Sequence, residues 1–194
     1  MRFRFRSRHA LALLAGLSPL VAVAHPGGGA HDSFAQGVMH PLTGIDHMLA
    51  ILGIAMWSAQ QNGRLRWLMP LSFVVLMVAG ALLGFGAPAP GALDQALAAT
   101  VLMGGLFVAS SLRTRELPAL LASGGFALLH GIAHGVESPT VGALGYGLGF
   151  LSATLLLGAA GFAAASLARR KGAEIALRLA GGAVAAAGLS MSFV

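Results

Sequence analysis

The sequence predicts an all-α integral membrane protein: a bundle of six transmembrane helices that follows a cleaved N-terminal signal peptide, with both termini outside. Composition is the first observation, because 57% of the 194 residues are hydrophobic, only 9% are charged, and the mean hydropathy is +0.82. A soluble domain carries about 25% charged residues, so this chain has too little polar surface to face water. The other two observations are the spacing of its apolar segments and the placement of its basic residues.

The N-terminus has the layout of a secretory signal peptide. Basic residues come first, the apolar run from Ala10 to Val23 follows, and Ala22-Val23-Ala24 supplies the small residues of a cleavage site. The run is shorter than the ~20 residues that a membrane span needs, which favours cleavage after Ala24 over a retained first helix. The expected parts are a signal peptide over 1–24, an extracellular histidine-containing tail over 25–35 and a transmembrane domain over 36–194.

Six apolar segments follow the tail, each long enough to cross a bilayer. Turn-forming residues separate them, as in Gln60-Gln61-Asn62-Gly63 and Ser138-Pro139. The expected spans cover residues 36–59, 67–86, 91–112, 118–136, 141–168 and 173–193.

The basic residues orient these spans. Those of the mature chain lie in the loops after the first, third and fifth spans, with Arg178 just beyond the last of these loops, whereas the other two loops and the mature N-terminus contain no Lys or Arg. Because positively charged loops stay in the cytoplasm, both termini are expected outside. An outside N-terminus also agrees with a cleaved signal peptide.

Ionisable residues inside the spans are concentrated in two of them. Such groups are costly in hydrocarbon and are functional candidates by default. The chain has no cysteine, so any metal would need nitrogen and oxygen ligands; imidazole with carboxylate suits Ni, Co, Zn or Cu(II) better than Mg or Ca. A helix–helix hydrogen bond explains any one of these histidines, but the whole set indicates a metal site. The first span carries His40, Asp46 and His47, and the fourth span with its outer end carries His130, His134 and Glu137.

Spacing places the groups of the fourth span on one helix face. His130 and His134 are four residues apart, and Glu137 lies three residues further. The first span enters from outside and the fourth returns to the outside, so the two sets of groups can meet at one level beneath the outer face.

The first span poses a geometric problem. His40 and His47 are seven residues apart, which is ~10 Å along a straight helix at 1.5 Å per residue. One ion cannot contact both unless the helix breaks at Pro41 or Gly44 or starts late. Asp46 either binds the metal directly or orients a histidine.

The mature tail offers a second candidate cluster. Cleavage would leave His25 with both an α-amine and an imidazole, and His31 and Asp32 follow closely. This cluster can bind a divalent cation; a flexible tail without metal fits the same residues equally well.

These residues resemble the signatures of the HupE/UreJ family of nickel/cobalt permeases. The stretch from His40 to His47 fits H-x5-D-H in the first mature span. The stretch from Leu129 to Glu137 fits F-H-G-x-A-H-G-x-E with Leu129 in place of Phe. The resemblance covers essentially the whole chain and implies that His40, Asp46, His47, His130, His134 and Glu137 carry the metal. It also implies uptake of Ni²⁺ or Co²⁺ across a bacterial inner membrane, with indirect supply to hydrogenase, urease or cobalamin enzymes.

The expected function is therefore a secondary permease rather than an enzyme, with Ni²⁺ or Co²⁺ as substrate and no organic cofactor. The chain has no G-x4-G-K-[ST] motif, so ATP hydrolysis is not expected. The expected partners are the metal ion and the lipid bilayer, not nucleic acid. Whether the chain forms a homo-oligomer stays open. Two alternatives also stay open: an intramembrane hydrolase that uses a metal-bound water, and a metal-binding accessory protein that does not transport.

Overall fold

The computed structural model describes residues 30–193, and these form α-helices and no strands. The all-α class is therefore confirmed. The expected signal peptide and His25 lie outside the described residues, as do the side chains of His31 and Asp32. The helices are α2 (Ala30–Thr43), α3 (Ile45–Gln60), α4 (Leu65–Gly84), α5 (Leu93–Ala109), α6 (Glu116–Glu137), α7 (Ala143–Arg170) and α8 (Glu174–Met191).

Helix length and hydropathy support fewer membrane spans than the sequence predicts. Within the described part of the chain, α4, α6, α7 and α8 are long and apolar enough to cross a membrane, and the bent pair α2–α3 raises the number from four to five. The helix α5 is apolar but has only 17 residues. The count of six spans stays a prediction, with α5 as the short member.

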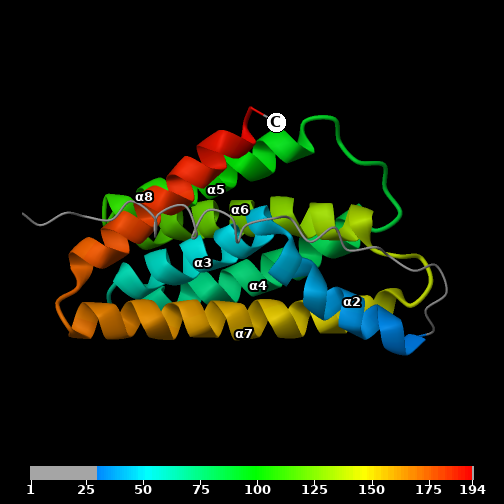
Figure 1. The fold of residues 1–194 in the computed structure, drawn as a ribbon, viewed down its shortest axis with the longest axis horizontal. Coiled ribbons are helices and arrows are strands. Elements are labelled where there is room, and N and C mark those ends of the chain that lie inside the picture. The colour runs from blue at the N-terminus through cyan, green and yellow to red at the C-terminus, as the bar shows by residue number, and fades with distance from the viewer. Residues whose placement is uncertain (1–29, 194) are drawn as a thin grey trace, which may run out of the picture.

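The first predicted span is not one helix, as Figure 1 shows. The chain breaks at Gly44, whose φ of −75° and ψ of 102° are extended, and the two helices are bent by 72°. Pro41, in the last turn of α2, has no N–H to continue the helical hydrogen bonds. At the end of α2 the Thr43 hydroxyl donates to the Met39 carbonyl at 3.0 Å.

Glycines allow close packing in three pairs of helices, which together include every named helix except α3. A Cβ on Gly80 or Gly84 of α4 would collide with the backbone of α6, and a Cβ on Gly131 or Gly135 of α6 would collide with α4 in return. Small residues let membrane helices approach this closely. The same reciprocity joins α2 to α7 through Gly37 and Gly149, and α5 to α8 through Gly105, Gly181 and Gly188.

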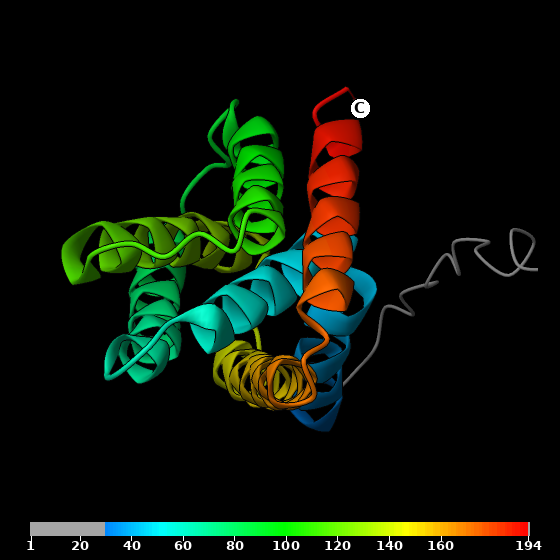
Figure 2. The ribbon, with the colours of Figure 1, turned by 90° about the vertical axis from the view of Figure 1, so that its left-hand side faces the viewer.

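The helix α3 runs through the middle of the molecule, between these pairs (Figures 1 and 2). Its C-terminal end is tied to the end of α5. The Trp57 indole N–H and the Gln61 amide donate to the Leu112 carbonyl at 2.8 and 2.9 Å, and the Gln60 amide donates to the Val108 carbonyl at 3.1 Å. The opposite, N-terminal end of α3 carries Asp46 and His47 beside the break.

Two adjacent glycines test the packing of α5 on α8. A Cβ at Gly105 would overlap the backbone of Ala185, whereas a Cβ at Gly104 would meet no atom within 4 Å. We expect Gly105→Ala to lower the free energy of unfolding by about 1–3 kcal/mol, because it pushes the two helices apart. Gly104→Ala should lower the free energy of unfolding by less than ~1 kcal/mol or should raise it, since alanine favours helix more than glycine does. Denaturant unfolding in detergent measures both, and equal losses would contradict this packing.

Candidate metal centre

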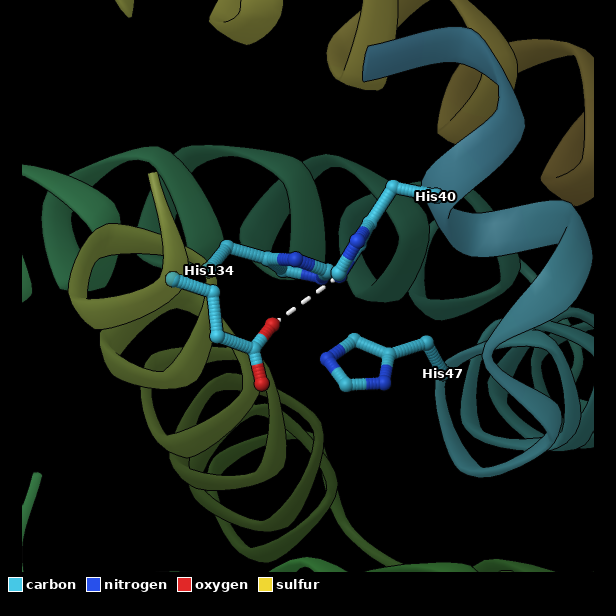
Figure 3. Close-up of side chains that lie close together, drawn as sticks. His40, His47 and His134 are labelled. Carbon is cyan, nitrogen blue, oxygen red and sulfur yellow. Dashed lines mark ion pairs between the residues drawn. The ribbon is translucent and has the colours of Figure 1, made fainter. Parts of the chain in front are cut away.

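Four side chains from three helices converge at the break between α2 and α3 (Figure 3). Each offers one ligand atom, and these atoms all lie within 4.8 Å of one another. Metal–ligand bonds from imidazole and carboxylate are about 2.0–2.2 Å long, so small side-chain adjustments close the group around one ion. We call His40, His47, His134 and Glu137 the four-residue group.

The break solves the geometric problem of the first span. The ring centroids of His40 and His47 lie 5.4 Å apart, against ~10 Å of rise along a straight helix. The helix is broken at Gly44, one of the arrangements that the sequence allows, and the two rings come close enough to face a common point. Gly44 leaves room for this turn, because a Cβ there would lie 3.3 Å from both the His40 carbonyl and His47 Nδ1.

The four-residue group has an open side and a closed side. The side chains of Glu137 and His40 are 47% and 27% exposed, and their carboxylate and Nε2 atoms lie 3.0 Å apart. His47 and His134 are buried, with ring centroids 4.1 Å apart. A ligand entering from the exposed side would meet the carboxylate first and the buried imidazoles second.

Several ring nitrogens at this site are buried without a hydrogen-bond partner among the described residues. They include Nε2 of His47 and Nδ1 of His134. A buried polar atom without a partner costs about 1–3 kcal/mol, and neutral imidazole nitrogens are common metal ligands. A divalent cation shared by the group would satisfy these atoms together, so the residues present fit a metal ion.

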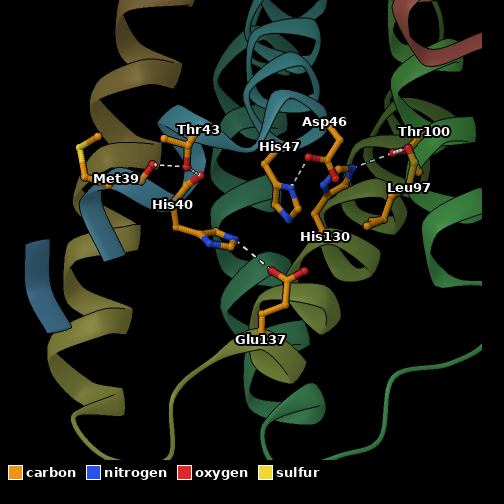
Figure 4. A network of polar contacts seen from close by, with 9 residues as sticks. All are labelled: Met39, His40, Thr43, Asp46, His47, Leu97, Thr100, His130 and Glu137. Atoms are coloured by element: carbon orange, nitrogen blue, oxygen red, sulfur yellow. Dashed lines mark hydrogen bonds and ion pairs between the residues drawn. The ribbon is translucent and has the colours of Figure 1, made fainter. Parts of the chain in front are cut away.

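Asp46 contacts His47 rather than joining the four-residue group. Its Oδ1 lies 2.8 Å from His47 Nδ1 (Figure 4). A carboxylate on one ring nitrogen fixes the orientation of the imidazole and leaves the other nitrogen for a metal. Of the two roles that the sequence leaves open for Asp46, the geometry favours the orienting role.

His130 also lies beside the four-residue group rather than in it. Its ring is buried one turn deeper in α6, with its centroid 5.2 Å from that of His47. Its Nε2 lies 2.8 Å from the hydroxyl of Thr100 on α5 (Figure 4). Sequence reasoning missed Thr100, whose only signal is a hydroxyl within an apolar stretch.

The helix α7 supplies a wall that the sequence also did not predict. The Phe150 ring lies 3.8 Å, centroid to centroid, from that of His134, and the Tyr146 ring lies 5.7 Å from that of His40. Both residues are buried. The close contact of α2 with α7 at Gly37 and Gly149 brings this wall to the site.

Titrating the purified protein with Co²⁺ in detergent tests whether Asp46 orients His47 or binds the metal directly. We expect Asp46→Asn to weaken binding about 10- to 100-fold, because it removes the charge that orients His47. The absorption spectrum of bound Co²⁺ should keep its wild-type shape, whereas His134→Ala, which removes a member of the four-residue group, should change it. A changed spectrum in Asp46→Asn would instead identify Asp46 as a direct ligand.

Comparison with known proteins places the chain in a family. The chain matches the family described as "HupE / UreJ protein" over residues 11–191. It is 39% identical over 174 residues to Protein HupE of Rhizobium leguminosarum bv. viciae, which covers 89% of this chain and 91% of that protein. No solved structure matches the chain. With its apolar helices and these two matches, the chain is a multi-pass membrane protein that belongs to the HupE/UreJ family.

Proposed function

We propose that this chain is a secondary permease that takes up Ni²⁺ or Co²⁺ across the bacterial cytoplasmic membrane. The observation that carries the proposal is the convergence of the four-residue group at a helix break inside a membrane protein. Three imidazoles and a carboxylate without sulfur suit Ni²⁺ and Co²⁺. The resemblance of both histidine motifs to those of nickel/cobalt permeases supports the same substrates.

In the proposed topology six spans cross the membrane, with α2–α3 as the first span and α5 as a short third one. The signal peptide is removed and both termini lie outside, because the basic loops stay in the cytoplasm. This orientation places the open side of the four-residue group, with Glu137 and His40, towards the outside.

The proposed path begins at the tail, where His25, His31 and Asp32 capture hydrated metal. The ion then passes Glu137 and His40 and loses water as the imidazoles of His47 and His134 replace it. Asp46 and Glu137 offset its charge. An inside-negative potential favours entry by about 4.6 kcal/mol per 100 mV for a divalent ion, twice the value per unit charge. The metal then supplies hydrogenase, urease or cobalamin enzymes.

Uptake of radiolabelled Ni²⁺ and Co²⁺ into proteoliposomes with an imposed inside-negative potential tests the proposal. We expect His47→Ala and Glu137→Gln each to lower the initial rate at least ~10-fold, because the first removes an imidazole and the second removes the charge of the carboxylate. The matched control is Glu116→Gln at the other end of α6. Glu116 pairs with Arg64 at 2.8 Å, remote from the histidines, and such exposed pairs contribute only about 0–1 kcal/mol.

The outcomes of this experiment separate the proposal from its alternatives. Uptake by the wild type and by Glu116→Gln, lost in the two site variants, would support the permease. Tight metal binding without uptake by the well-folded wild type would overturn it and favour the metal-dependent hydrolase or the accessory protein.

The tail makes a separate prediction. We expect replacement of His25, His31 and Asp32 by alanine to raise the metal concentration at half-maximal uptake several-fold, with the maximal rate unchanged, because capture precedes translocation. Concentration-dependent uptake in the same proteoliposomes measures both quantities. A lower maximal rate at saturating metal would contradict a role limited to capture.

A further inference from the structure

Thr100 joins α5 to the deepest histidine of the site. Its side chain is buried, with 5% of the residue exposed. Its Oγ1 lies 2.8 Å from His130 Nε2 and 2.7 Å from the Leu97 carbonyl oxygen (Figure 4). Both distances are typical of strong hydrogen bonds.

These two contacts determine which nitrogen of His130 carries a proton. A threonine hydroxyl has one proton to donate, and a carbonyl oxygen can only accept. The Thr100 proton therefore goes to the Leu97 carbonyl, and the Thr100 oxygen accepts from Nε2–H of His130. If Thr100 donated to His130 instead, two oxygen lone pairs would face each other at 2.7 Å.

The other nitrogen of His130 is then available as a ligand. In the Nε2–H tautomer, Nδ1 carries a lone pair, and this atom is buried without a hydrogen-bond partner among the described residues. A doubly protonated ring would leave a buried Nδ1–H without an acceptor, which is costly. The neutral Nε2–H tautomer satisfies every contact that the ring makes.

We propose that Thr100 is a positioning residue that holds His130 as the Nε2–H tautomer, so that Nδ1 serves as the next metal ligand after the four-residue group. This inference rests on the proposed permease function. His47 is the neighbour common to both positions, because its ring centroid lies 4.1 Å from that of His134 and 5.2 Å from that of His130. An ion held by His47 thus has a second imidazole on its buried side.

The tautomer can be measured without any metal. Nitrogen chemical shifts of protein labelled with ¹⁵N-histidine distinguish a protonated from an unprotonated ring nitrogen, and His130→Gln identifies the signals of His130 by difference. We expect an unprotonated Nδ1 in wild type and in Thr100→Ser, which keeps the hydroxyl. Thr100→Val, which keeps the shape without the hydroxyl, should lose the single tautomer.

Thr154→Val is the matched control, because Thr154 is also buried and its hydroxyl has no hydrogen-bond partner among the described residues. It should leave the His130 signals unchanged. The inference is overturned if Thr100→Val keeps the wild-type tautomer, or if Thr100→Ser disturbs it as much as Thr100→Val does, since Thr100 would then act through packing alone.

Uptake in proteoliposomes completes the test. We expect Thr100→Val to slow metal uptake about 10- to 100-fold, as loss of an orienting partner does, and Thr100→Ser to stay within a few-fold of wild type. Normal uptake by Thr100→Val would overturn the inference while the permease stands. If wild type shows the tautomer but no uptake, the permease is overturned and the hydrogen-bond role of Thr100 stands.

Discussion

The break at Gly44 is the constraint on which the site depends. A straight helix would separate His40 and His47 by two turns, and no single ion could contact both. The 72° bend turns α2 away from α3, so that the two histidines approach the same point from different helices. Pro41 and Gly44 are the residues that permit it, because one lacks a backbone donor and the other leaves space beside the His47 ring.

The second histidine motif combines ligand placement with helix packing. Neighbouring residues on a helix point about 100° apart, so the pairs His130-Gly131 and His134-Gly135 direct two kinds of residue to two faces of α6. The glycines allow the backbone of α4 to approach, and the histidines project towards α3 and α5. One short motif therefore fixes both the position of α6 and the face on which its imidazoles lie.

Burial makes the imidazoles of this site dependent on their partners. Inside an apolar bundle a ring nitrogen without a hydrogen-bond partner is costly. Each histidine therefore needs a neighbouring group that orients one ring nitrogen, and the other nitrogen needs a ligand of its own. Asp46 lies against His47 at 2.8 Å, and Thr100 lies against His130 at the same distance. These two contacts hold His47 and His130 in a row of imidazoles that runs from the exposed Glu137 to the interior.

The sequence by itself determined the helical membrane class, the positions of most helices and the ionisable groups that meet at the site, because hydropathy and helical spacing are local properties. It also showed that His40 and His47 could share an ion only across a broken helix. Only the tertiary structure decided that the break exists at Gly44, that Asp46 and His130 lie beside the four-residue group, and that Thr100 and Tyr146 adjoin it. These features depend on how closely glycine-lined helices approach one another, and residue spacing within one helix carries no information about a contact between two.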